Sequence, residues 1–301
     1  MNINAKLSGS IFGIISAVTY GMNPLFGLPL YQKGITTYSV LFYRFFFALI
    51  LLGIIMLIRK QSFKIEKKQL LMSGIGGILL SLSCLGLFLS FHHIDGGIAV
   101  TILFVCPVII SSIMYLFFHV KQSISTLIGM FCAMGGIALL SLGKGVEHFS
   151  LTGIVLAFSS ASTYAIYMVM VKVSCLKNLS SETLTFYVML FGLSVFFVTL
   201  NFGINLQILP DIFSLLCALG LALFPSLFSF LFMAIAIKHI GPSKTAILGV
   251  LEPVTALLIG ILVFGESLSF QQIIAVAIIL ISVSIVVTGK PPATVKAKLK
   301  S

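Results

Sequence analysis

Long apolar runs alternate with short polar segments along the 301-residue chain. Each run spans about 18 residues or more, enough for a helix rising about 1.5 Å per residue to cross a hydrocarbon layer of about 30 Å. Backbone polar groups inside that layer must be satisfied within the segment, so each run is expected to be a helix. The pattern predicts ten transmembrane helices, near residues 7–29, 36–58, 69–91, 96–118, 123–142, 150–172, 181–203, 211–236, 243–264 and 269–289.

Composition and loop length agree with an integral membrane protein. Apolar residues make up 59% of the chain and charged residues 8%, too little polarity to cover a soluble domain. The connecting segments leave no room for an extramembrane domain, so the helix bundle itself must carry the function. The first run could also be a cleaved signal peptide, but its match to a later run, described next, indicates that it is retained.

A duplication underlies the ten runs. A shift of 144 residues superposes the first and second runs on the sixth and seventh, and a shift of 146 superposes the third and fourth on the eighth and ninth. Matched Gly, Pro, His and Tyr in a near-constant register are hard to attribute to chance. We predict a first repeat over 1–145, a second over 146–290 and a basic tail over 291–301. The matched pairs are Gly9 with Gly153, Ala17 with Ala161, Thr19 with Thr163, Tyr20 with Tyr164, Phe42 with Phe186, Tyr43 with Tyr187, Gly74 with Gly220, His93 with His239, Ile94 with Ile240, and Pro107 with Pro253.

Each predicted repeat contains five spans, and this odd number inverts the second repeat in the membrane relative to the first. The expected fold class is an all-α membrane protein with ten transmembrane helices arranged as two inverted five-helix repeats. In transporters, inverted repeats place the substrate site near the midplane at the repeat interface. Two states of similar energy then arise when the halves exchange conformations.

The net charge of +11 is distributed unevenly over the loops. With the N terminus inside, fifteen basic residues fall on the inner side, whereas Lys33 and Lys144 fall outside and Arg44 lies within a run. This bias predicts cytoplasmic termini and explains the basic charge without nucleic acid. The basic tail is also expected to touch anionic lipid. The inner residues are Lys6, Arg59, Lys60, Lys64, Lys67, Lys68, Lys121, Lys172, Lys177, Lys238, Lys244, Lys290, Lys296, Lys298 and Lys300.

Glu252 is an ionisable residue deep inside the ninth run. At about 1.5 Å per residue from Ser243, it lies roughly 13 Å from the inner boundary, close to the midplane. A charge there costs at least about 2.5–3.5 kcal/mol, so the side chain should face the bundle interior and be paired or protonated. Pro253 lacks an amide hydrogen and collides with the Gly249 carbonyl, which predicts a kink or opening at that level. Carboxylate and break together favour a binding and coupling site over a purely structural pairing.

Arg44 is the other full charge well inside a run. It lies about 12 Å from the outer boundary, a depth from which its long side chain could reach the level of Glu252. Three roles stay open: counter-ion of Glu252, ligand for an anionic substrate, or structural anchor of the second helix.

The first run contains a polar amide before a proline, Asn23 and Pro24, and is expected to bend there. Asn23 could hold a substrate at the bend or make an interhelical hydrogen bond. Tyr20 and Tyr164 stand beside small-residue ladders that permit close helix packing, and either could overhang a cavity. Pro107 and Pro225 are further expected helix breaks. The ladders are Gly9, Gly13, Ala17 and Gly21, and Gly153, Ala157, Ala161 and Ala165.

The remaining polar residues carry weaker signals. His92, His93 and Asp95 favour a solvated outer turn over a proton relay or pH sensor, because adjacent helical histidines diverge by about 100° and make a poor metal pair. Glu266 reads as a solvated residue or a cap. Five scattered cysteines form neither a disulfide framework nor a zinc spacing. The sequence contains no nucleotide-binding, hydrolase or metalloprotease motif in a suitable setting, so we expect no enzyme activity, cofactor or metal.

The sequence resembles the EamA-type transporters of the drug/metabolite transporter superfamily over nearly its whole length. The resemblance is carried by the ten spans in two repeats, by ASTY in the sixth run, by HIGPSKTAIL, and above all by LEPVTALLIGILVFGESLSFQQIIA, Leu251 to Ala275. The first repeat departs from it, with Cys106 before Pro107 and Val120 where a glutamate like Glu266 would be expected. The resemblance implies a multi-pass permease of the bacterial inner membrane, often an exporter of amino acids or related metabolites, with a central cavity.

The function expected is alternating-access secondary transport, as a probable exporter, of small metabolites such as amino acids. Glu252 is the first candidate for substrate binding or proton coupling, followed by Tyr20, Asn23, Tyr164 and Arg44. The alternatives are a metabolite exchanger without proton coupling and a ligand-binding membrane sensor or scaffold. The expected partners are a small-molecule substrate and the lipid bilayer, with protons and a second copy of the chain in a homodimer left open.

Overall fold

The computed structural model describes residues 3–141, 150–265, 267 and 269–289, and this part of the chain is built from helices. Ten helical spans in it are long and apolar enough to cross a membrane, as the sequence predicts. Six are single helices: α3 (Thr37–Ile58), α4 (Lys67–Ser90), α7 (Ile124–Ser141), α8 (Leu151–Val173), α9 (Ser181–Thr199) and α14 (Phe270–Thr288). Four are interrupted or distorted: α1 (Ile3–Gly21) with α2 (Asn23–Gln32), α5 (Gly96–Leu103) with α6 (Cys106–Leu116), α10 (Ile212–Leu221) with the π turn η2 (Ala222–Phe228) and α11 (Ser229–Ile240), and α12 (Pro242–Leu248) with α13 (Leu251–Phe264). A short 3-10 turn, η1 (Cys175–Asn178), follows α8.

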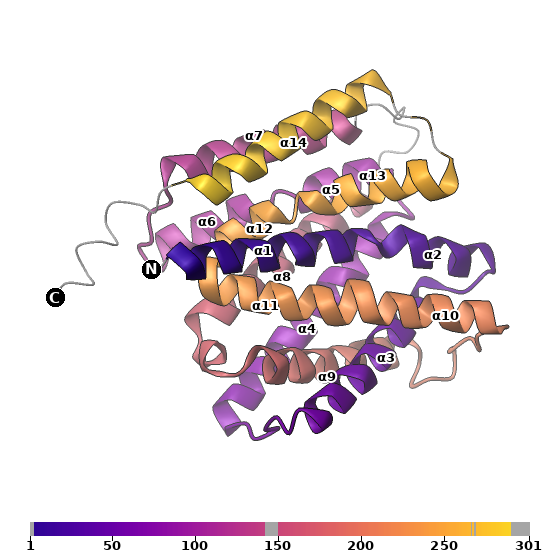
Figure 1. The fold of residues 1–301 in the computed structure, drawn as a ribbon. Coiled ribbons are helices and arrows are strands. Elements are labelled where there is room, and N and C mark those ends of the chain that lie inside the picture. Colours follow the sequence, from indigo (N-terminus) through magenta and orange to yellow (C-terminus); the bar gives the residue numbers. More distant parts are fainter. Residues whose placement is uncertain (1–2, 142–149, 266, 268, 290–301) are drawn as a thin grey trace.

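The spans alternate in direction, which gives the bundle two ends. We call the end where α1 begins and α14 finishes the N-terminal face, and the other end the far face (Figure 1). The Lys6 ammonium donates to the Gly289 carbonyl at 2.6 Å, so the first and last spans meet at the N-terminal face. Every described basic residue that we assigned to the inner side lies at this face, and Lys33 lies at the far face. Lys144, Glu266 and the basic tail lie outside the described residues.

Large apolar side chains cover the outer surface of the bundle. Examples are Phe131, Leu151 and Leu262, whose exposed fractions are 65%, 74% and 81%. A soluble protein rarely exposes apolar surface on this scale. Lipid is the solvent that suits it.

The two repeats make reciprocal hydrogen bonds through buried serines. The Ser16 hydroxyl in α1 donates to the Ser229 carbonyl in α11 at 2.9 Å. The Ser160 hydroxyl in α8 donates to the Ser83 carbonyl in α4 at 2.7 Å. Since 160 is 16 shifted by 144 and 229 is 83 shifted by 146, each bond is the other with the repeats interchanged.

Two tyrosines repeat this pattern. The Tyr43 hydroxyl donates to the Gln207 carbonyl at 2.9 Å, and the Tyr187 hydroxyl donates to the Phe63 carbonyl at 2.8 Å. A shift of 144 relates Tyr43 to Tyr187 and Phe63 to Gln207, so each bond is again the other with the repeats interchanged. The first bond lies at the far face and the second at the N-terminal face.

Glycine packing follows the same rule. A Cβ at Gly9 would lie 2.6 Å from the Cβ of His239, and one at Gly153 would lie 2.7 Å from a methyl of Ile94. His239 and Ile94 belong to the histidine–isoleucine pairs that a shift of 146 superposes. Contacts that recur with their partners interchanged are the mark of a two-fold relation. The described helices therefore form two inverted five-helix repeats, as predicted. The predicted boundary between 145 and 146 falls outside the described residues and stays a prediction.

Candidate functional site

The α12–α13 span is interrupted immediately before Glu252. Helix α12 ends at Leu248 and α13 begins at Leu251. Because Pro253 has no amide hydrogen to offer the Gly249 carbonyl, that carbonyl accepts from the Glu252 amide instead, at 2.8 Å. The tighter turn ends one helix and starts the next, and it places the Glu252 side chain in the first turn of α13.

The counterpart span of the first repeat has the same interruption. Helix α5 ends at Leu103 and α6 begins at Cys106, one residue before Pro107. The Val108 amide donates to the Val105 carbonyl at 2.9 Å, a tight turn like the one at Glu252. Cys106 occupies the position equivalent to Glu252, so the repeats share the break but not the carboxylate.

Each repeat also has one distortion that has no counterpart in the other repeat. In the first span, α1 ends at Gly21 and α2 begins at Asn23. The side-chain nitrogen of Asn23 donates to the Tyr20 carbonyl at 2.8 Å. We expected a break at Pro225 as well, but the helix continues there as the π turn η2. The Ser226 hydroxyl donates to the Leu221 carbonyl at 3.0 Å, which satisfies a carbonyl that Pro225 cannot reach. The chain therefore stays helical.

Arg44 joins these two distortions. Its Nη1 donates to the Asn23 side-chain oxygen at 3.2 Å, its Nη2 to the Pro225 carbonyl at 2.9 Å, and its Nε to the Ser226 hydroxyl at 2.6 Å. The guanidinium carbon also lies 5.0 Å from the Tyr20 ring centroid and 5.5 Å from that of Phe230. Arg44 is 1% exposed, so these partners enclose it almost completely. Among the three roles predicted for Arg44, this geometry fits the structural anchor. The side-chain oxygen of Asn23 is used in the interhelical bond from Arg44.

A cavity of about 720 Å³ extends from this cluster to the far face. Its inner end is bounded by Tyr20, Asn23, Arg44 and Glu252. Toward the far face its wall includes Tyr31, His92, Gly96 and Gln272, which lie at or near the far-face ends of their helices. The volume is in the range of about 300–1,000 Å³ that small-molecule sites occupy.

A second, much smaller hollow lies on the other side of Glu252. It holds about 30 Å³ and is lined by Gly13, Cys106, Tyr164 and Glu252 among others. That volume accommodates about a water molecule or two. The Tyr164 hydroxyl donates to the Met233 sulfur at 2.9 Å. Leu103, Phe104 and Glu252 line both spaces, and Glu252 is the ionisable residue among them. Its carboxylate therefore stands between the far-face cavity and the interior of the closed side.

The difference between the two sides follows from how the broken spans pack. At the N-terminal face α12 packs against α6 and closes the bundle. Their counterparts at the far face are α5 and α13, which lack extensive packing of this kind and both line the cavity. Equivalent helices are thus together on one side of the molecule and apart on the other.

Glu252 itself is only partly buried and has no fixed partner. Over residues 3–141, 150–265, 267 and 269–289, its carboxylate makes no hydrogen bond or ion pair, including with Arg44. Among the predicted candidates, Tyr20, Asn23, Arg44 and Glu252 meet at one cavity, and Tyr164 reaches Glu252 from the small hollow. The counterparts of Asn23, Arg44 and Glu252 are Tyr167, Val188 and Cys106, so the polar groups of the cavity occur where the repeats differ.

The other polar residues have local roles. His93 packs against Gly153, whereas His92 lies on the cavity wall near the far face. Asp95 precedes α5. The serine bonds Ser16–Ser229 and Ser160–Ser83 were not among the predicted features, although both pairs fall in the same registers as the duplication and could have been found there.

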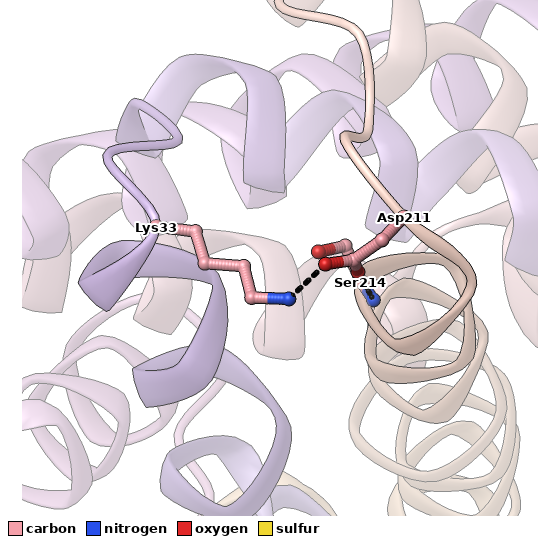
Figure 2. A network of polar contacts seen from close by, with 3 residues as sticks. All are labelled: Lys33, Asp211 and Ser214. Carbon is pink, nitrogen blue, oxygen red and sulfur yellow. Dashed lines mark hydrogen bonds and ion pairs between the residues drawn. The ribbon is translucent and has the colours of Figure 1, made fainter.

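An ion pair joins the two repeats at the far face. The Lys33 ammonium, after α2, meets a carboxylate oxygen of Asp211, before α10 (Figure 2). The other Asp211 oxygen accepts from the Ser214 amide at 2.7 Å and caps α10. The hydrogen bond from Lys33 lowers the pKa of the Asp211 carboxyl to about 2, and those from Ser214 contribute to the same shift.

Fold and cavity together define a multi-pass membrane protein of the inverted-repeat carrier class. The sequence matches the EamA-like transporter family over residues 7–142 and again over 151–288, once in each half. A protein of Archaeoglobus fulgidus named "Uncharacterized transporter" is 27% identical over 196 residues, which cover 63% of this chain and 66% of the archaeal protein, just under two thirds of its length. A solved structure, described only as "Crystal structure of protein", superposes with a TM-score of 0.79 at 15% identity, covering 93% of this chain and 96% of that one, and shares the fold.

The protein belongs to the EamA-like transporter family, within the drug/metabolite transporter superfamily. The family is one of transporters, and the ten apolar spans of the described chain suit a lipid environment.

Proposed function

We propose that the protein is a secondary active transporter that exports a small metabolite across a bacterial inner membrane by alternating access, with both termini in the cytoplasm. The single observation that carries the proposal is the position of Glu252: it borders the far-face cavity and the closed-side hollow, with no partner in the described chain. A group in that position can bind a ligand from either side.

The packing of the broken spans supports alternating access. Exchange of the repeat conformations would bring α5 against α13 at the far face and separate α12 from α6 at the N-terminal face. Glu252, at the break, would then face a cavity open to the N-terminal side. No new contact type is needed, because the closed side already provides the arrangement that the open side would adopt.

The surroundings of Glu252 support coupling to protons as part of this proposal. An empty site is closed at lower energetic cost when the carboxyl is neutral, since a buried unpaired charge is expensive. A proton taken up from the far side would leave toward the cytoplasm when substrate replaces it. Basic residues gathered at the N-terminal face support placing that face in the cytoplasm, and the inward proton gradient would then drive export.

The test is transport by reconstituted protein, with a substrate selected from a metabolite panel by the melting-temperature rise it causes. Transport by the wild type should accelerate when a pH gradient is imposed. Glu252→Gln should lose that acceleration, whereas Glu182→Gln, at the N-terminal end of α9 and away from the cavity, should retain it.

The proposed coupling role fails if Glu252→Gln transports at the wild-type rate with the wild-type pH response. Counterflow that persists in the wild type after collapse of the gradient, with no response to its restoration, would indicate exchange without protons. Binding without any movement of substrate would indicate a sensor or scaffold.

A further inference from the structure

The cavity has two ionisable groups of opposite charge type at its inner end, Arg44 and Glu252. Their opposite charges would suit a zwitterion such as an amino acid, provided that both groups were available to it. Their surroundings decide whether they are.

Arg44 is not available to a ligand carboxylate. Each of its three nitrogens donates to a protein oxygen, which uses three of its five N–H groups, and the aromatic rings of Tyr20 and Phe230 have their centroids within 5.5 Å of its guanidinium carbon. Recognition of a carboxylate by arginine normally uses two parallel N–H groups at the open edge of the guanidinium. With the side chain 1% exposed, forming that pair would require the anchor of two helix distortions to be dismantled.

Glu252 is available. It is the only acidic residue among the described residues that line the cavity, and its oxygens make no hydrogen bond or ion pair in that part of the chain. When the cavity closes over it, a carboxylate in this setting needs a cation to offset the cost of its charge. A cationic nitrogen supplies what the site lacks.

Most of the remaining wall is apolar, and its polar residues, among them Tyr31, His92 and Gln272, lie toward the far face. Leu41, Leu87, Phe88, Val100, Phe104 and Leu257 contribute to the apolar wall. Such a wall gains by covering an apolar body of a ligand, at about 25 cal/mol per Å² removed from water. Apart from Arg44, His92 is the one described lining residue that can carry a positive charge, and it lies toward the far face and not at the inner end with Glu252.

We propose that the substrate is an amphipathic amine, with one cationic nitrogen bound to Glu252, an apolar body along the cavity wall, and no free carboxylate. This deepens the proposed function, because it rests on Glu252 as the substrate contact. It also narrows the class suggested by family resemblance, since free amino acids would bring a carboxylate for which the inner end of the cavity provides no partner.

The experiment compares matched sets of ligands that share a body and differ in charge. The first set is phenethylamine, phenylalanine and 3-phenylpropionate. The second is tryptamine, tryptophan and indole-3-propionate. The third is hexylamine, 2-aminoheptanoate and heptanoate. Binding to the full-length chain, purified in detergent, is measured by calorimetry and by the concentration dependence of its melting temperature.

In at least one set the amine should bind at least tenfold more tightly than the amino acid, and the acid should not bind. Glu252→Gln should weaken binding of that amine at least tenfold, whereas Glu182→Gln should not change it. The proposal is overturned if an amino acid binds as tightly as its amine or if no amine in the three sets binds to the folded wild type. It is also overturned if Glu252→Gln, folded by gel filtration, binds the amine unchanged.

The outcomes separate this inference from the proposed function. Equilibrium binding requires no gradient. An amine that binds but is not transported would therefore contradict the proposed transport function and support the proposed ligand class. An amino acid that binds and is transported in response to a pH gradient would contradict the proposed ligand class and support the proposed transport function.

Discussion

Arg44 illustrates how a charge inside a membrane protein can be structural. Its five N–H groups form a rigid planar fork, and the fork connects a helix break in one repeat to a π turn in the other. A lysine has the same charge but presents a single ammonium and cannot reach three oxygens in three directions. Depth and charge could be predicted from the sequence. The partners could not, because Asn23 and Ser226 are neutral and far from Arg44 in the chain.

Arg44→Lys should therefore lower stability although it conserves charge. Loss of two of the three hydrogen bonds, at about 1.5–3 kcal/mol each for bonds to a charged group, leaves buried oxygens without donors. We expect a fall in melting temperature in detergent that exceeds that of Arg59→Lys, a matched change at the exposed end of α3. Equal melting temperatures for the two variants would show that the anchor contributes little.

Asp211 is a residue whose contribution to stability should depend on pH. Its folded pKa is lowered to about 2 from the usual value of about 3.9, so the stabilisation is present above the unfolded pKa and is lost as pH falls through the folded one. Asp211→Asn keeps an oxygen to cap α10 but removes the pair with Lys33. The melting-temperature difference from wild type should be constant near neutral pH and shrink between about pH 4 and pH 2.

The control for this prediction is Lys33→Met. Alone it should act in the same direction as Asp211→Asn, and added to Asp211→Asn it should have little further effect, because the partner charge is already gone. The same pH dependence in Asp211→Asn as in the wild type would assign the acid sensitivity to other groups.

Helical spans were more predictable than their internal breaks. Apolar length alone sufficed for ten spans, and a proline four residues beyond a carbonyl sufficed for the breaks before Pro107 and Pro253. The same reasoning misjudged Pro225, because the neighbouring Ser226 hydroxyl reaches the Leu221 carbonyl and keeps the turn helical. Whether a proline ends a helix depends on which donor replaces its missing amide, and that donor is set by local three-dimensional geometry.

Packing of helices along the small-residue ladder has a clear physical cause. A Cβ at Gly21 would lie 2.5 Å from the Glu252 carbonyl oxygen. The glycine therefore lets the end of α1 approach the backbone at the break in the ninth span. The ladder predicted that another helix packs closely against the first span. It did not predict that this helix is the one that carries Glu252, because residue spacing within one helix contains no information about its neighbour.

At the scale of the molecule, the reciprocal contacts distinguish what should move from what should not. Exchange of the repeat conformations converts Ser16–Ser229 into Ser160–Ser83 and the reverse. Since both bonds exist together in one state, both should also exist in the other. The α6–α12 contact lacks a counterpart between α5 and α13, so that contact should change.

Cross-linking tests this division, in a background in which the native cysteines are replaced by alanine. A Ser16→Cys, Ser229→Cys pair, whose parent hydroxyl oxygens lie 3.4 Å apart, should permit transport when oxidised. A Val100→Cys, Leu257→Cys pair, which places one thiol on α5 and one on α13 in the cavity lining, should stop transport when joined by a bifunctional thiol reagent. Transport blocked by the first link and tolerated with the second would contradict exchange between the repeats.

The inversion of the repeats was readable because matched residues survive in two registers. The position of the cavity was not, because it depends on which pair of equivalent helices is apart. Glu252 drew attention as an acid in an apolar run, and the same reasoning placed Arg44 near it. That Arg44 is enclosed and Glu252 exposed to the cavity followed only from their neighbours.

Asn23, Arg44 and Glu252 correspond to Tyr167, Val188 and Cys106 in the other repeat, so the two halves are alike in backbone and unequal in chemistry. Inequality of that kind gives the unloaded carrier a preferred resting orientation, and about 1.4 kcal/mol between the orientations suffices to hold roughly ten molecules in eleven on one side. A carrier biased in this way waits with its entrance toward one compartment, and the return step of its cycle becomes the step that sets its turnover.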